Sequence, residues 1–263
     1  MKVKALDQQK QNISTLIPRH PFSMSIIGAK SSGKSSLLIN LLKQQDGLKG
    51  VFNRVILISP TCTMDDKIQD LINTPILKRN NTLDKALKKQ LKVKNIMDKD
   101  FQEIHADEYI NSADVFEELT PQFLNDLMEH QKNVIEEFGK SSSDKVLLVL
   151  DDSIQNKFLH SRQFINFVLL SRHVNISLIL ISQAYFLVPK SIRLNCSCLV
   201  LFEISNNKEL DAIFDENFIG ISRGKFMEIY GKVMEVPFNF LTILHQNQRG
   251  KKLLACMERF INL

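Results

Sequence analysis

Short runs of consecutive apolar residues alternate along this chain with segments in which apolar residues recur every three or four positions. An uninterrupted apolar run of about four to eight residues is typical of a strand buried on both faces of a parallel sheet. Apolar residues at helical spacing predict helices with one buried face. We therefore expect strands at 23–27, 54–60, 146–150, 176–182, 199–202 and 239–245, and helices at 36–42, 164–171, 205–218 and 222–234.

This alternation predicts an α/β fold, in which a mostly parallel sheet is covered by helices on both faces. The chain of 263 residues is long enough for one large domain, and we expect 1–263 to form a single unit. The interval 61–145 is too long for an ordinary loop between two strands. We interpret it as a largely helical insertion within that domain.

Opposite charges separate within this interval. The stretch 78–99 holds eight lysines and arginines against two aspartates, whereas 101–138 holds ten acidic residues against one lysine, although the net charge of the whole chain is only +5. Leu83, Leu87 and Leu91 recur every four residues in the basic stretch and predict an amphipathic helix with a lysine-rich outer face. Two interpretations stay open: this face contacts a phosphate backbone, or it pairs with the acidic stretch.

The residues that follow the first predicted strand form a complete G-x-x-x-x-G-K-[ST] phosphate loop. They read Gly28-Ala29-Lys30-Ser31-Ser32-Gly33-Lys34-Ser35, and Ser36 opens the predicted helix behind them. The glycines let backbone N–H groups turn toward a bound phosphate, while the helix N-terminus adds positive potential. Lys34 is suited to bridge the β- and γ-phosphates, and the Ser35 hydroxyl to ligate Mg²⁺. We therefore expect 28–36 to bind the phosphates of a nucleotide.

Polar residues end two further predicted strands. Asp151 and Asp152 follow the run 146–150, and Gln183 follows 176–182. Ligands of open α/β sheets bind beyond the carboxyl ends of the strands, where all three side chains would lie. We expect Asp151 to support Mg²⁺ together with Ser35, Asp152 to polarise the attacking water, and Gln183 to hydrogen-bond the γ-phosphate or that water.

Cysteines and hydropathy point to no other kind of site. The four cysteines, Cys62, Cys196, Cys198 and Cys256, lack Cys-x-x-Cys spacing, so buried thiols are expected rather than a zinc site or disulfides. No run approaches the roughly 18 apolar residues that cross a bilayer, and the polar first residues lack the core of a signal peptide. We expect a soluble intracellular protein that is not secreted and has no membrane partner.

Four segments together resemble the FtsK/HerA superfamily, and within it the DNA-packaging ATPases of poxviruses, other large DNA viruses, virophages and Polinton-like elements. These segments are 20–28, 147–152, 171–183 and 188–196. The most specific feature is the Arg-His-Val-Asn-Ile-Ser stretch at 172–177, because nucleotide binding in general does not require it. The likeness covers the core and leaves 61–145 without a counterpart. It places the fold among P-loop ATPases with an additional strand next to the phosphate-loop strand.

The resemblance implies a ring-forming motor that uses ATP hydrolysis to drive double-stranded DNA into a preformed capsid. Such a protein acts as a homo-oligomer at the site of viral assembly in the host cell, with capsid proteins as further partners and an association with the virion. Ring motors place an arginine of one subunit against the γ-phosphate bound by its neighbour. Arg172 is the first candidate for that role and Arg193 the second. Asp152 stands where many superfamily members carry the longer glutamate.

Other functions stay open at this point. A helicase or a DNA pump would share the same ATP site. A small-molecule kinase would use 61–145 as a lid over its acceptor. A nucleotide-dependent switch is a third alternative, but the segments 156–159 and 207–210 both lack the aspartate of the guanine-reading Asn-Lys-x-Asp motif, which disfavours a GTPase.

Overall fold

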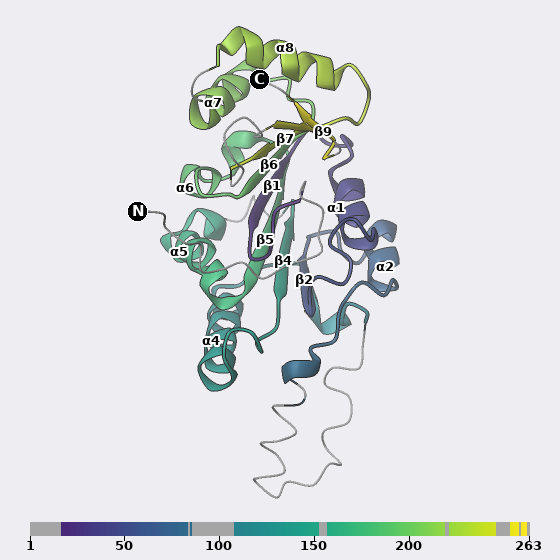
Figure 1. The fold of residues 1–263 in the computed structure, drawn as a ribbon, viewed down its shortest axis with the longest axis vertical. Helices are drawn as coiled ribbons and strands as arrows, with labels where there is room; N and C mark the ends of the chain where they lie inside the picture. The colour runs from purple at the N-terminus through teal and green to yellow at the C-terminus, as the bar shows by residue number, and fades with distance from the viewer. Residues whose placement is uncertain are drawn as a thin grey trace, which may run out of the picture.

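A single mixed sheet organises the part of the chain that the computed structural model describes, namely residues 17–83, 85, 108–152, 157–218, 221–245, 253–257 and 259–261. Its strand order is β3-β2-β4-β5-β1-β6-β7-β8-β9 (Figure 1). The strands are β1 Ser23–Ile27, β2 Arg54–Ile58, β3 Val115–Phe116, β4 Val146–Asp151, β5 Ile176–Ser182, β6 Cys198–Leu201, β7 Leu241–Leu244, β8 Leu253–Ala255 and β9 Arg259–Ile261. Strands β3 to β6 along this order are parallel, and β7, β8 and β9 are antiparallel.

The prediction of a mostly parallel sheet covered by helices is confirmed. All six predicted strands are present, and β5 lies between β4 and β1, which makes it the additional strand. β5 pairs with β4 and β1 through all of its seven buried residues. Because these central strands run in the same direction, the chain segments that follow β1, β4 and β5 meet at one edge of the sheet.

Helices cover the two faces of the sheet in separate layers (Figure 1). One face packs against α1 Lys34–Lys43 and α2 Asp66–Ile72. The other face packs against α4 Pro121–Phe138, α5 Arg162–Ser171, α6 Lys190–Arg193, α7 Asn207–Asn217 and α8 Arg223–Met234. Short 3₁₀ segments occupy several connections, η2 Ser112–Asp114, η4 Lys157–His160, η5 Arg172–Val174 and η6 Tyr185–Leu187.

Side-chain caps explain where several of these helices begin. Thr120, Ser161 and Ser222 precede α4, α5 and α8, and each side chain accepts a hydrogen bond from the backbone N–H three residues later. Such caps satisfy backbone donors that a helix leaves without an internal partner, and each contributes about 1 kcal/mol. Gly33, ahead of α1, provides no such side chain, a difference that matters for the site below.

The interval 61–145, for which a helical insertion is expected, adds helices α2 and α4 and the short strand β3 to the fold in the parts that are described. β3 adds a parallel edge strand next to β2, and α4 buries Leu124 and Leu127 in the same core as α5. Gln131 of α4 is only 1% exposed, and its amide donates to the carbonyl oxygens of Asp144 and Val174, 2.9 and 3.1 Å away. These bonds attach α4 to the starts of β4 and β5, so it belongs to the α/β layer itself.

Three further predictions concern the lysine-rich stretch, the cysteines and the apolar segments. Most of the lysine-rich stretch, with Leu87 and Leu91, lies outside the described residues. Cys62, Cys196 and Cys198 are buried free thiols as expected, whereas Cys256 is half-buried. Burial raises the pKa of Cys196 to about 12, which keeps it protonated and unreactive at neutral pH. None of the described helices combines the length and the apolar character that crossing a membrane requires.

Candidate nucleotide-binding site

The phosphate loop connects the end of β1 to the start of α1, at the carboxyl edge of the sheet. Its first glycine is forced by packing, since a Cβ on Gly28 would lie 2.6 Å from the Cβ of Phe202 and 2.7 Å from the Ser32 hydroxyl. Gly33 has a φ of 107°, in the left-handed region that glycine tolerates best. The two glycines thus let the loop close tightly over Phe202 at the end of β6.

The loop presents unsatisfied donors to the space above it. No described side chain caps the first turn of α1, so its first backbone N–H groups point outward with the positive end of the helix dipole. The Ser32 hydroxyl is buried and has no partner among the described atoms. An anion seated on the loop would satisfy both kinds of donor.

Lys34 is held inside the loop. Its ammonium group donates to the carbonyl oxygens of Gly28 and Ala29, 2.8 and 2.7 Å away, and the residue is only 6% exposed. Burial lowers the pKa of Lys34, while Asp152 and Asp151 oppose that shift by attraction. The charge is therefore placed at the loop by geometry before any phosphate arrives, which is the arrangement that binding a polyphosphate requires.

Asp151, the last residue of β4, is buried next to other charges. Its pKa is raised to about 6, first by burial and then by repulsion from Asp152 and Asp65, while Lys34 opposes the shift. A nearby cation favours the charged form of a buried carboxylate. A divalent cation held by Asp151 and the Ser35 hydroxyl would supply such a charge, and both are the hard oxygen ligands that Mg²⁺ prefers.

The structure brings Asp152 and Gln183 together. The Gln183 amide donates to a carboxylate oxygen of Asp152 at 3.0 Å, although 31 positions separate them in the chain. Asp152 has a φ of 46°, which is unusual for a residue other than glycine and turns the chain sharply after β4. In addition, the Gly28 N–H donates to the Ser182 carbonyl at 3.1 Å, which ties the loop directly to the strand that carries Gln183.

A cavity of about 730 Å³ opens over the loop and includes side chains that the sequence pattern did not indicate. Its lining joins Lys30–Ser36 to Asp152 and, from the α2 segment, to Asp65 and Lys67. Asp65 caps α2 by accepting from the Lys67 N–H at 2.9 Å, and the Lys67 ammonium donates to the Ser36 hydroxyl at 3.1 Å. No local motif marks these two residues, because only the packing of α2 on α1 brings them to the loop.

Aromatic side chains form the remaining wall. Phe238 is 72% exposed, has a φ of 66°, and lines both the main cavity and a second hollow of about 320 Å³ on the other side of the loop. Phe240 packs on Phe202 with ring centroids 5.2 Å apart. The second hollow also contains Glu203 and Asn239. An exposed ring beside hydrogen-bonding groups is the chemistry that holds a nucleotide base.

The two candidate arginines differ sharply. Arg193 is buried, and its guanidinium makes two hydrogen bonds to Glu216, at 3.1 and 2.7 Å, and one to the Val188 carbonyl at 2.9 Å. It also lies over the ring of Tyr185, with 4.3 Å between the guanidinium carbon and the ring centroid. These contacts commit Arg193 to its own subunit, so the structure does not support it as a residue that reaches a neighbour.

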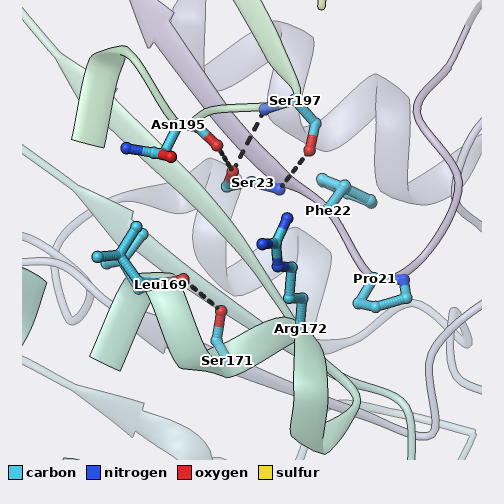
Figure 2. Close-up of a pocket in the computed structure, with 9 residues that line it drawn as sticks. Pro21, Phe22, Ser23, Leu169, Ser171, Arg172, Asn195 and Ser197 are labelled. Carbon is cyan, nitrogen blue, oxygen red and sulfur yellow. Dashed lines mark hydrogen bonds between the residues drawn. The ribbon is translucent and has the colours of Figure 1, made fainter. Parts of the chain in front are cut away.

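Arg172 is exposed and lies at the opposite end of the sheet from the phosphate loop. Figure 2 shows its side chain extending from the end of α5 toward Phe22 and Ser23 at the start of β1, across a small hollow of about 40 Å³. The phosphate loop follows the other end of β1, five residues and about 17 Å away. Arg172 therefore lies outside the ATP site of its own subunit.

The described side chains do not form a complete metal site by themselves. Among the residues that the structure covers, no group of three or more His, Cys, Asp or Glu side chains is arranged to hold a metal ion. The donors near the loop, Ser35 and Asp151, nevertheless fit a cation that takes its remaining ligands from water and from phosphate oxygens, which is the usual situation for Mg²⁺.

Comparison with known proteins extends this picture. The family described as Poxvirus A32 protein matches residues 81–236, more than half of the chain. The crystal structure of B204, the DNA-packaging ATPase from Sulfolobus turreted icosahedral virus, superposes with a TM-score of 0.55 at 15% identity and covers 90% of this chain and 98% of its own. The genome-packaging NTPase B204 from Sulfolobus turreted icosahedral virus 2, in complex with AMPPCP, gives a TM-score of 0.52 at 14% identity, with 89% and 96% covered. None of the curated proteins matches the sequence. At these identities the structural likeness shows a shared fold.

Proposed function

Because the chain belongs to the Poxvirus A32 protein family, we propose that it is an ATP-driven motor that packages double-stranded viral DNA into a preformed capsid. One observation carries the ATPase part of this proposal. A phosphate loop with an inward-facing lysine, a buried acidic residue and an acid–amide pair all lie at the carboxyl edge of one parallel sheet. The whole-chain likeness to two viral packaging ATPases supports the motor part.

The residues divide the chemistry among themselves. In this proposal the backbone N–H groups of the loop and Lys34 bind the β- and γ-phosphates, which neutralises the charge that hydrolysis concentrates there. Mg²⁺ held by Ser35 and Asp151 would add a further positive charge between the same phosphates. Asp152 orients and polarises the attacking water, and Gln183 holds Asp152 in place until a γ-phosphate offers its amide a competing partner.

That last exchange links hydrolysis to movement. In this proposal the γ-phosphate of ATP draws the Gln183 amide away from Asp152, so the hydrogen bonds of Gln183 change when ATP becomes ADP. The chain that follows Gln183 runs into η6 and α6, where the buried Arg193–Glu216 pair connects it to α7. We propose this segment as the path by which the state of the nucleotide reaches the rest of the subunit.

Assembly into a homo-oligomeric ring completes the proposed site. Arg172 is exposed and remote from its own phosphate loop, so it would act on the γ-phosphate of a neighbouring subunit. Double-stranded DNA is the proposed substrate of the motor, capsid proteins are its proposed partners, and the viral assembly site in the host cell is its proposed location. The kinase alternative, with 61–145 as a lid, is disfavoured because the described residues 108–145 contribute β3 and α4 to the sheet layer.

Steady-state ATP hydrolysis with and without double-stranded DNA tests the proposal, with the oligomeric state recorded in the same samples. We expect DNA to stimulate the native protein, Lys34→Ala to abolish hydrolysis, and Lys43→Ala, at the far end of the same helix, to leave it unchanged. An assembled ring that hydrolyses ATP through Lys34 but ignores DNA would refute the packaging function.

A second measurement addresses the trans role of Arg172. The rate per native subunit should rise with protein concentration across the assembly range, and Arg172→Ala should assemble without that rise. Mixing Arg172→Ala with native subunits should then lower the rate of the native ones. A rate per subunit that stays flat through assembly would contradict a residue shared between neighbours.

A further inference from the structure

Basic side chains gather at the amino ends of the parallel strands, whereas the ATP site lies at their carboxyl ends. One groove of about 670 Å³ contains Arg19, Lys140, Lys145, Arg172 and His173. A second groove of about 760 Å³ contains Lys49, Lys78, Arg79 and again Lys145. Both grooves share Ser141, Ser143 and Lys145, so they form one continuous surface. We call this set of residues, without Arg172, the basic surface.

Among the described residues, no acidic side chain lines this surface, although the whole chain has 29 acidic residues against 34 basic ones. The carboxylate next to Lys145 in the sequence, Asp144, is buried and accepts from the side-chain amide of Asn80 at 2.8 Å. Within the described part of the chain, the side chains of Arg19, Lys78 and Lys140 make no ion pair.

The positive charges act on one another. The pKa of His20 is lowered to about 3, first by burial and then by repulsion from Lys145 and Lys140. Burial also lowers the pKa of Lys145, with Lys78 adding to the effect. Burial is the larger cause of both shifts, and repulsion between the positive charges adds to it. The surface would therefore gain from an anion that lies across it.

Two asparagines hold the lysines of the surface in place. Asn53, just ahead of β2, accepts from the Lys145 N–H at 2.8 Å and donates to the Lys78 carbonyl at 2.6 Å. Asn175, just ahead of β5, donates to the Lys140 carbonyl and to the Ser143 hydroxyl, both at 2.7 Å. The backbones of three lysines from two separate segments are thus fixed relative to the sheet, which lowers the entropy lost when a ligand binds.

From this arrangement we infer that the basic surface binds the phosphate backbone of double-stranded DNA. The inference rests on the proposed function and gives it a location on the subunit. The lining pairs cationic side chains with hydroxyl and amide groups, the usual donors to phosphate oxygens. An anionic membrane is the other extended polyanion to consider, but it is flat and favours apolar side chains that insert. The exposed large apolar residues of the described chain lie outside both grooves.

The position of the surface allows DNA binding and ATP binding to be separated. The central strands begin at the basic surface and end at the phosphate loop, so the length of β1, five residues or about 17 Å, lies between the two sites. Substitutions on the surface should therefore leave the nucleotide site intact. Arg172 is left unchanged in the test because it is also the proposed trans residue.

The test compares two triple variants that remove the same charge. Arg19→Gln/Lys78→Gln/Lys140→Gln changes three exposed side chains of the basic surface. Among the described contacts of these three, only the Lys140 side chain makes a hydrogen bond, a long one of 3.4 Å to the Arg172 carbonyl. Lys208→Gln/Lys225→Gln/Lys232→Gln is the matched control on α7 and α8. Binding of a short fluorescein-labelled DNA duplex to the full chain is measured by anisotropy at salt concentrations between about 0.05 and 0.3 M.

We expect the surface variant to bind DNA on the order of tenfold or more weakly near 0.1 M salt, with a log–log salt slope reduced by about two to three. The control should keep the native affinity and slope, and ATP hydrolysis without DNA should be native in both variants. Native affinity and slope in the surface variant would overturn the inference while leaving the proposed function standing. A native protein that binds no DNA at any salt would refute both. Loss of binding to phosphatidylserine vesicles with DNA binding unchanged would assign the surface to a membrane and overturn the inference.

Discussion

The ion pair between Arg193 and Glu216 offers a sharp test of whether this arginine is structural. The two side chains are 7% and 11% exposed, and two hydrogen bonds of 3.1 and 2.7 Å join them. The Tyr185 hydroxyl donates to the same carboxylate at 2.7 Å. Replacing Glu216 with Gln keeps the shape of the side chain and removes its charge. The guanidinium then stays buried without a counter-charge.

The expected loss of unfolding free energy follows from the hydrogen bonds that Arg193 keeps in Glu216→Gln. Removing one partner of a buried pair costs about 3–5 kcal/mol of unfolding free energy. We expect about 3 kcal/mol for Glu216→Gln, because the glutamine oxygen still accepts one bond and the Val188 carbonyl still accepts another from Arg193. The double variant Arg193→Met/Glu216→Leu should recover most of that loss, since neither charge is then buried.

At acidic pH, the difference in unfolding free energy between the native protein and Glu216→Gln should disappear. Burial raises the pKa of Glu216, but hydrogen bonds from Arg193 and Tyr185 outweigh it, and the net pKa lies below the ordinary 4.5. A carboxylate with a lowered pKa stabilises the fold above pH 4.5 and loses that contribution as the pH falls through its folded value. The gap between native protein and Glu216→Gln should therefore be full at pH 7 and shrink below that point.

Urea unfolding of the native chain, the two variants and Lys190→Gln measures all of this. Lys190 is exposed and lies 3.9 Å from Glu216, so its replacement should cost less than about 0.5 kcal/mol. The reasoning is refuted if Glu216→Gln unfolds within about 1 kcal/mol of the native protein. It is also refuted if Arg193→Met/Glu216→Leu folds and assembles normally but loses ATP hydrolysis, which would make Arg193 a trans residue after all.

Three further predictions concern the nucleotide site. Gly28→Ala should lower the unfolding free energy by about 1–3 kcal/mol and weaken ATP binding, because its Cβ would meet that of Phe202 at 2.6 Å; a variant as stable as the native protein would contradict this packing. Asp151 has a pKa of about 6 against an ordinary 3.8, so its charge costs stability as the pH rises through 6. In chelator, Asp151→Asn should therefore be about 2–3 kcal/mol more stable than native at pH 8, with a smaller gain at pH 5 and no gain for exposed Asp215→Asn, while its hydrolysis is lost. Phe238→Ala should weaken ATP binding about three- to tenfold, Phe238→Trp should not, and tripolyphosphate binding should be equal in both; an equal loss for tripolyphosphate would rule out base stacking.

Local sequence was sufficient for the framework of the site. An uninterrupted apolar run has few options other than a strand buried on both faces, so β1, β4 and β5 could be predicted from their residues. The phosphate loop and the polar residues that end β4 and β5 follow directly from positions along the chain. Since parallel strands all end at one edge, the meeting of Asp152 with Gln183 followed from topology, and the structure records it as a hydrogen bond.

The residues that reach the site from distant parts of the sequence could be identified only from the tertiary structure. Asp65 and Lys67 reach the loop only because α2 packs on α1, and Phe238 only because the turn before β7 folds back over Gly33. The short strand β3 consists of two residues, too few for any periodicity, which is why no strand was expected within 61–145.

Whether a charged side chain is paired or exposed to solvent also required the tertiary structure. Arg172 and Arg193 are equivalent as letters, but Glu216 lies 23 positions from one of them and buries it, whereas the other stays in solvent. The basic surface collects residues from segments as far apart as Arg19 and Lys145. The sequence by itself determined which strands are buried and where phosphate binds, because those properties depend on neighbours along the chain. Only the tertiary structure decided which charges are paired and which face solvent, because electrostatic interactions act through space and depend on burial.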